Sequence, residues 1–194
     1  MHPAEEYRYP TLLYNTSMLF PLASALGIIP PSDVCDSIDV WRRRYDRFSA
    51  NFPPHITLTY PPFLPEERWP VFSLELAECL AGFEPFEVVL ERVGAFPGIP
   101  MGLWLLPRDG GTLARLRAAL ESSFPQYVEP LPFAFTPHVT VGTFEEKEPL
   151  EAARAALEAA WQPLRFSVDR IFFIVQQPGG RWQMKDFLRL GKQA

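Results

Sequence analysis

The stretch FPPHITL at residues 52–58 is repeated in similar form as FTPHVTV at residues 135–141. This repeat is the strongest indication of how the chain is organised. Phe, Pro, His and Thr coincide in the two copies, and the positions between them are apolar in both. The chain has only three histidines, yet His55 and His138 each follow a proline and each precede a threonine by two residues. This coincidence indicates an internal duplication that places one copy of a functional motif in each half of the chain.

The spacing within the motif predicts a strand with its polar side chains on one face. Residues i and i+2 of a strand point to the same side, about 6–7 Å apart, so His55 lies beside Thr57 and His138 beside Thr140. If the two halves pack about a pseudo-twofold axis, the two pairs face each other across one cleft. Imidazoles with an ordinary pKa of about 6.5 suit acid–base catalysis near neutral pH, and threonine hydroxyls suit phosphate oxygens. We therefore expect the two histidines to be catalytic and the two threonines to bind phosphate.

Apolar periodicity and proline boundaries divide the chain into alternating strands and helices. The expected order is β-α-β-α-β, a break at Pro97-Gly98-Ile99-Pro100, and then β-α-β-α-β-β, which predicts an α+β fold built from two duplicated βαβαβ units. Strands are expected at 18–23, 55–60, 86–96, 101–106, 138–144, 166–175 and 182–190, and helices at 33–48, 66–80, 112–124 and 150–161.

Composition limits the possible functions. A chain of 194 residues with 47% apolar and 21% charged residues is typical of one globular domain. The net charge of −5 argues against a broad binding surface for duplex DNA, which needs a basic face. The longest apolar run, residues 18–29, is too short to cross a bilayer, and the residues before it lack the cationic start of a secretory signal. We expect a cytoplasmic protein without membrane contact.

Neither a metal nor a cofactor is expected. Two histidines lack the third or fourth ligand that zinc prefers, and Cys35 and Cys79 match no metal-ligand spacing. One predicted helix ends in a cationic stretch. We interpret this stretch as a favourable interaction with the helix dipole, in preference to an RNA-binding patch. That stretch contains Arg42, Arg43, Arg44 and Arg47.

The two Pro-His-apolar-Thr-apolar motifs, with Tyr60-Pro61-Pro62-Phe63 after the first, resemble those of the two-histidine phosphoesterase superfamily. Within it, the bacterial and archaeal 2′-5′ RNA ligase and RNA 2′,3′-cyclic phosphodiesterase branch is most similar. The resemblance implies a bilobal fold in a single domain over residues 1–194, with lobes of about 1–98 and about 99–194. Two antiparallel sheets would line a central cleft, with the helices outside.

The same resemblance implies metal-independent hydrolysis of 2′,3′-cyclic phosphate ends of RNA or nucleotides to 2′-phosphates, with 2′-5′ RNA ligation as the reverse reaction. His55 and His138 become the acid–base pair, and Thr57 and Thr140 the phosphate-binding hydroxyls. By analogy alone His138 would be the base and His55 the acid; the sequence does not assign the direction. We expect a monomer, because the pseudo-twofold arrangement already builds the cleft within one chain.

The chain departs from the family pattern after the second motif. Many members carry an arginine or an aromatic residue five positions after the second histidine, whereas this chain has Thr143, followed by Phe144. The equivalent position in the first half is Tyr60, which could stack on a base or pack against Phe63. Phe20, on the first expected strand, is a further stacking candidate or else a core residue. These four residues are the possible substrate contacts.

Two alternatives stay open from the sequence. The same site could act on a 2′-5′ oligonucleotide or on a cyclic phosphate of the ADP-ribose type. The protein could instead be a binding or regulatory module for RNA ends with little turnover. In each case the expected partner is an RNA 3′ end or a small nucleotide.

Overall fold

The computed structural model describes residues 23–96, 100–128, 131 and 134–192, which form a sheet covered by helices. The strands are β1 (Ser24–Ile28), β2 (Ile56–Thr57), β3 (Phe86–Phe96), β4 (Met101–Arg108), β5 (Val139–Phe144), β6 (Leu164–Val168), β7 (Arg170–Gln176) and β8 (Trp182–Arg189). The helices are α1 (Ser32–Tyr45), α2 (Trp69–Leu80), α3 (Thr112–Ser123) and α4 (Lys147–Ala160), and a 3-10 turn, η1 (Glu66–Arg68), precedes α2. The α+β class expected from the sequence is confirmed.

The eight strands form one antiparallel sheet in the order β6-β3-β4-β5-β2-β1-β7-β8. The two motif strands, β2 and β5, are neighbours at its centre, paired at Ile56 and Val139. This corrects the expectation of two separate sheets. The junction is narrow because β2 has only two residues, and prolines, which cannot donate to a strand ladder, stand on both sides of it at 53–54 and 61–62.

The halves of the sheet do not coincide with the halves of the sequence. Strand β3, from the first half, pairs with β4 and β6, while β7, from the second half, pairs with β1. The expected division near residue 98 therefore separates the two sequence repeats, but each half of the sheet contains strands from both sides of that division. The first repeat contributes β3 to the part of the sheet that carries β5, and the second contributes β7 and β8 to the part that carries β2.

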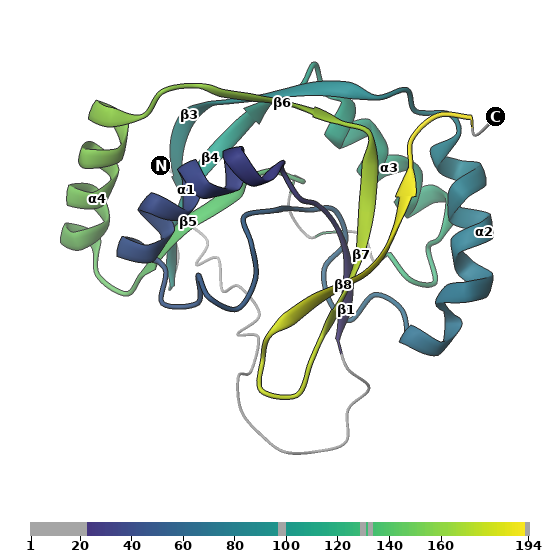
Figure 1. The fold of residues 1–194 in the computed structure, drawn as a ribbon. Coiled ribbons are helices and arrows are strands. Elements are labelled where there is room, and N and C mark those ends of the chain that lie inside the picture. Colours follow the sequence, from purple (N-terminus) through teal and green to yellow (C-terminus); the bar gives the residue numbers. More distant parts are fainter. Residues whose placement is uncertain (1–22, 97–99, 129–130, 132–133, 193–194) are drawn as a thin grey trace, which may run out of the picture.

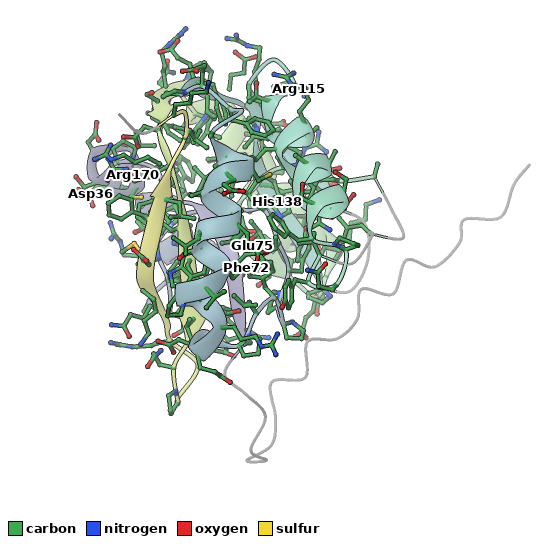
Figure 2. All side chains as sticks on the ribbon, turned by 90° about the vertical axis from the view of Figure 1, so that its right-hand side faces the viewer. Asp36, Phe72, Glu75, Arg115, His138 and Arg170 are labelled. Carbon is green, nitrogen blue, oxygen red and sulfur yellow. The ribbon has the colours of Figure 1, made fainter. Side chains whose placement is uncertain are left out.

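The helices lie on one face of the sheet, with α1 and α4 on one side of the molecule and α2 and α3 on the other (Figure 1). Figure 2 views the molecule from the side of α2, on which Phe72 and Glu75 are labelled. None of the described helices is long and apolar enough to span a membrane. The apolar residues of all four helices enter one core cluster with the inward side chains of the strands, and the helical members are Val34, Ile38, Trp69, Phe72, Leu76, Leu80, Leu113, Leu116, Leu120, Leu150, Ala153 and Leu157.

Several predicted elements need correction. The strand expected at 55–60 is β2, which has only two residues, and the helix expected at 150–161 begins at Lys147. The first strand, expected at 18–23, is β1 at Ser24–Ile28, where pairing with β7 fixes its register; residues 18–22 lie outside the described part of the chain. The strand expected at 166–175 is two strands, because the residues before Asp169 pair with β3 and those after it pair with β1. The helix expected to reach Phe48 ends at Tyr45.

Candidate active site

The two histidine motifs meet on the face of the sheet opposite the helices, which we call the histidine face. Ile56 and Val139 pair directly and both point into the helix-covered core. Extending this antiparallel register by one residue in each direction puts His55 opposite Thr140 and Thr57 opposite His138. Directly opposed side chains have Cβ atoms about 4.5–5.5 Å apart, and diagonal ones about 7–8 Å, so the two imidazoles lie on a diagonal with space for a phosphate group between them.

Both imidazoles are held in the same tautomer by the same kind of contact. The Nδ1 of His55 lies 2.9 Å from the carbonyl oxygen of Pro53, and the Nδ1 of His138 lies 2.8 Å from that of Thr136. A carbonyl oxygen only accepts, so each Nδ1 carries the proton and donates. In a neutral ring this leaves the lone pair on Nε2, where it is available to accept a proton.

Burial keeps both rings neutral in the free protein. It lowers the pKa of His55 to about 4; the hydrogen bond to Pro53 opposes this shift, while the charge of Arg42 and the proximity of His138 add to it. Burial also lowers the pKa of His138, again opposed by its backbone hydrogen bond. A phosphate anion between the rings would raise both pKa values, because it favours the protonated form.

Aromatic side chains flank each imidazole. The edge of Phe52 packs on His55 with ring centroids 4.9 Å apart. Trp104 and Phe96 contact His138 at centroid distances of 4.6 and 5.3 Å. These three residues were not among the candidates predicted from the sequence. The phenylalanine of the repeat could have pointed to Phe52, whereas the contacts of Phe96 and Trp104 depend on how β3, β4 and β5 align, which no local pattern reports.

The two threonines complete the group on the histidine face. Thr57 and Thr140 are both partly exposed. Within the described part of the chain neither hydroxyl hydrogen-bonds to another protein group, so both can donate to a ligand. Among the described residues, no three His, Cys, Asp or Glu side chains are grouped as metal ligands would be.

The three other predicted substrate contacts that the structure describes do not form one group with the histidines and threonines. Tyr60 is about one-third exposed, and its phenol has a raised pKa because of partial burial, which the nearby Arg117 of α3 opposes. A bulge at Val141 brings Thr143 to the side of β5 that carries Thr140, opposite Gly102. Phe144 turns towards Tyr45 of α1, with ring centroids 6.0 Å apart. Phe20 lies outside the described residues.

Thr143 and Phe144 share a cavity of about 650 Å³ at the end of β5. The C-terminal turn of α1 supplies part of its lining, so the cationic stretch noted in the sequence reaches this cavity. The charges in the lining are mixed: Arg43, Arg44, Arg47, Asp46, Glu145 and Glu146.

Paired His-x-Thr strands at the centre of an antiparallel sheet define the class of two-histidine phosphoesterases. A sequence model of the 2′-5′ RNA ligase superfamily matches residues 30–180 of this chain. The chain belongs to this superfamily, and the resemblance inferred from the motifs is confirmed.

Individual relatives and solved structures agree with this assignment. The chain is 26% identical over 168 residues to "Putative phosphoesterase BH1439" of Halalkalibacterium halodurans, covering 87% of this chain and 97% of that protein. It is 28% identical over 166 residues to GK0864 of Geobacillus kaustophilus, which has the same designation, covering 84% and 94%. The fold is similar to that of TT0787 of Thermus thermophilus, with a TM-score of 0.62, 21% identity, and 88% and 99% of the two chains covered. It is also similar to E. coli LigT complexed with 3′-AMP, with a TM-score of 0.61, 16% identity, and 89% and 100% covered.

Proposed function

We propose that this protein hydrolyses 2′,3′-cyclic phosphate ends of RNA or of nucleotides to 2′-phosphates, by acid–base catalysis with His55 and His138 and without a metal. The observation that carries the proposal is the arrangement of the two rings: both carry a proton on Nδ1, both leave Nε2 as the reactive nitrogen, and they lie diagonally across one strand pair. Two imidazoles on opposite sides of a phosphate suit in-line displacement, in which one group enters as another leaves.

In the proposed reaction, Nε2 of one histidine accepts a proton from water as the water oxygen bonds to phosphorus. The bond between phosphorus and the 3′ oxygen breaks, and Nε2 of the other histidine, protonated in the complex, donates its proton to that oxygen. The products are a 2′-phosphate and a 3′-hydroxyl. Thr57 and Thr140 donate hydrogen bonds to the non-bridging oxygens, which gain negative charge in the transition state.

The relatives support this proposal at a coarser level. The sequence relatives are named phosphoesterases, and E. coli LigT has been crystallised with 3′-AMP, ATP, NADP+ and phosphate. These names point to nucleotides and phosphate as the ligand class. Hydrolysis of 2′-5′ oligonucleotides or of ADP-ribose cyclic phosphate would use the same residues. So would 2′-5′ ligation, in which a 5′-hydroxyl attacks phosphorus in place of water while the same bond to the 3′ oxygen breaks. Monomeric state and cytoplasmic location remain predictions, the first of which light scattering after size exclusion would check.

The test is turnover of an oligonucleotide with a 2′,3′-cyclic phosphate end in the presence of EDTA, with the product position identified by chromatography. The double variant His55→Ala/His138→Ala is the blank. We expect many turnovers for the wild type and a 2′-phosphate product. Binding without turnover would favour the RNA-end binding module instead, and neither binding nor turnover would mean that RNA ends are not the substrate.

A further inference from the structure

On the histidine face, exposed aromatic and arginine side chains lie at the edge of the sheet, and a row of paired residues joins them to the site. A row of directly paired residues crosses four strands: Thr57 on β2, Gly27 on β1, Phe172 on β7 and Phe187 on β8. Neighbouring strands are about 4.8 Å apart, so Phe187 lies about 14 Å from Thr57 across three steps. Gly27 is buried, and the side chain of Ile174 lies close to its Cα, so the exposed part of the row is at its far end.

Side-chain contacts join this row to His55. Phe52 packs on His55 and belongs to a small apolar cluster with Ala25 and Ile174, against which Phe172 and Trp182 pack. The backbone N–H of Trp182 donates to the carbonyl oxygen of Asn51 at 3.0 Å, which ties the β7–β8 hairpin to the loop that leads to His55. The surface and the catalytic loop therefore form one connected structure.

The far end of the row has the chemistry of a nucleic-acid contact. Phe187 is 41% exposed, although it is a large apolar side chain, and Met184 on the same strand is 48% exposed. The guanidinium carbons of Arg170 and Arg189 lie 4.8 and 5.8 Å from the centre of the Phe187 ring, and Arg170 is labelled in Figure 2. Both arginines pair with Asp169, so this end of the row has two cations and one anion.

Both arginines have N–H groups that do not bond to Asp169 and can bind a further anion. Arg170 uses Nε and Nη2 on Asp169, while Arg189 uses Nη1. A guanidinium has five N–H donors, so each arginine keeps donors for phosphate oxygens. An exposed aromatic ring between two arginines matches a single-stranded nucleic acid, whose bases stack on rings and whose phosphates pair with guanidinium groups.

We propose that the surface formed by Phe172, Phe187, Arg170 and Arg189 binds the nucleotide that precedes the reacting end of a single-stranded RNA, with its base on Phe187 and its phosphate at the arginines. The inference rests on the proposed function and narrows its substrate class to oligonucleotides in preference to mononucleotides. Continuity with His55 and the positive charge of the surface select this occupant.

The test compares two substrates, a nucleoside 2′,3′-cyclic phosphate and a trinucleotide with a 2′,3′-cyclic phosphate end. Stacking on one aromatic side chain contributes enough that Phe187→Ala should lower kcat/KM for the trinucleotide roughly 5- to 100-fold while leaving the mononucleotide within about twofold. Phe187→Trp should restore trinucleotide activity. The matched control is Leu74→Ala on α2, which removes an apolar side chain that is 69% exposed, and it should change kcat/KM for neither substrate.

Arg189→Gln should weaken the salt dependence of trinucleotide binding, because one phosphate contact is lost.

Equal losses on both substrates, or no loss on the trinucleotide, would overturn the inference while leaving the proposed function intact. If the wild type hydrolyses neither substrate, the proposed function fails, and the surface is then tested by fluorescence anisotropy with a labelled trinucleotide that ends in a 3′-phosphate. Weaker binding by Phe187→Ala than by Leu74→Ala would support the surface independently of catalysis. Equal binding by these two variants would overturn it.

Discussion

The two copies of the histidine motif share four of seven residues, yet the protein surrounds them differently. In the first copy, Phe52 packs its edge on His55, whereas its counterpart Phe135 lies beside the Arg117 guanidinium, 6.0 Å from ring centre to guanidinium carbon. His138 is flanked instead by Phe96 and Trp104, which belong to neighbouring strands. The repeat thus reproduces the imidazole tautomer and the hydroxyl position but not the second layer of contacts.

The same contrast holds beside the threonines. The residue paired with Thr57 on the next strand is Gly27, while the residue paired with Thr140 is Trp104, which is 4% exposed. Thr140 therefore lies beside a buried tryptophan, whereas the residues that follow Thr57 across the sheet are a buried glycine and then Phe172 and Phe187. In the proposed function the duplicated residues provide the chemistry, and residues outside the repeat determine where a substrate extends.

Removal of either imidazole tests whether the two copies are equally necessary. Loss of a general acid or base costs on the order of 10²–10⁴-fold, so His55→Ala and His138→Ala should each lower kcat by that amount in EDTA. Circular dichroism would check that each variant folds. A fall of less than about tenfold in either variant would show that one copy is structural.

The threonines provide a smaller test of the same symmetry. A hydrogen bond to a charged group contributes about 1.5–3 kcal/mol, so Thr57→Val and Thr140→Val should each lower kcat/KM roughly 10- to 150-fold. Thr112→Val, on α3, is the matched control and should have no effect. If only one of the two site variants loses activity, the phosphate lies against a single motif.

The different surroundings of the histidines also affect stability as a function of pH. The pKa of His55 is about 4 in the folded protein and about 6.5 when unfolded, so the unfolded state binds its proton first as pH falls. The stabilisation is complete above pH 6.5 and is lost between pH 6.5 and 4. Urea unfolding should show that the wild type loses about 1–3 kcal/mol more over this range than His55→Gln does. Parallel losses in the two proteins would contradict the burial of a neutral His55.

The rate should depend on pH in the opposite sense, because kcat/KM should fall as the pH rises. The proposed mechanism needs one neutral and one protonated imidazole, and in the free protein the pKa values of His55 and His138 are both lowered. Because kcat/KM reports the free enzyme, it should fall about tenfold per pH unit above pH 6.5. The alkaline limb of kcat should lie at higher pH, since bound phosphate raises both pKa values. A kcat/KM that stays constant up to about pH 8 would contradict this.

Local pattern predicted much of this molecule. Alternating apolar residues gave β3 its observed bounds, and the i, i+2 spacing put each histidine beside its threonine. The order of the strands in the sheet was not predictable, because strand pairing depends on contacts between distant parts of the chain, which local sequence does not encode. One apolar run over 166–175 therefore concealed two strands with different partners, β3 and β1, separated at Asp169. The exchange of β3 and β7 between the halves of the sheet was missed for the same reason.

The candidate site shows the same limit. The repeat identified His55, Thr57, His138 and Thr140, which the register of β2 and β5 brings onto one face. Phe96 and Trp104 come to His138 from β3 and β4, and no signal near the motif indicated them. Lowered pKa values are likewise a property of burial in the assembled sheet, so the sequence alone gave both histidines their ordinary value.

The central claim is that the two copies form one reaction centre, and the most direct test is a double-mutant cycle on hydrolysis of a cyclic-phosphate-ended trinucleotide. Residues that act together in one transition state have strongly non-additive effects. We predict that His55→Ala/His138→Ala is no more than a few-fold slower than the slower single variant. If the two single losses multiply in the double variant, the histidines act independently, and the account of a shared acid–base pair is wrong.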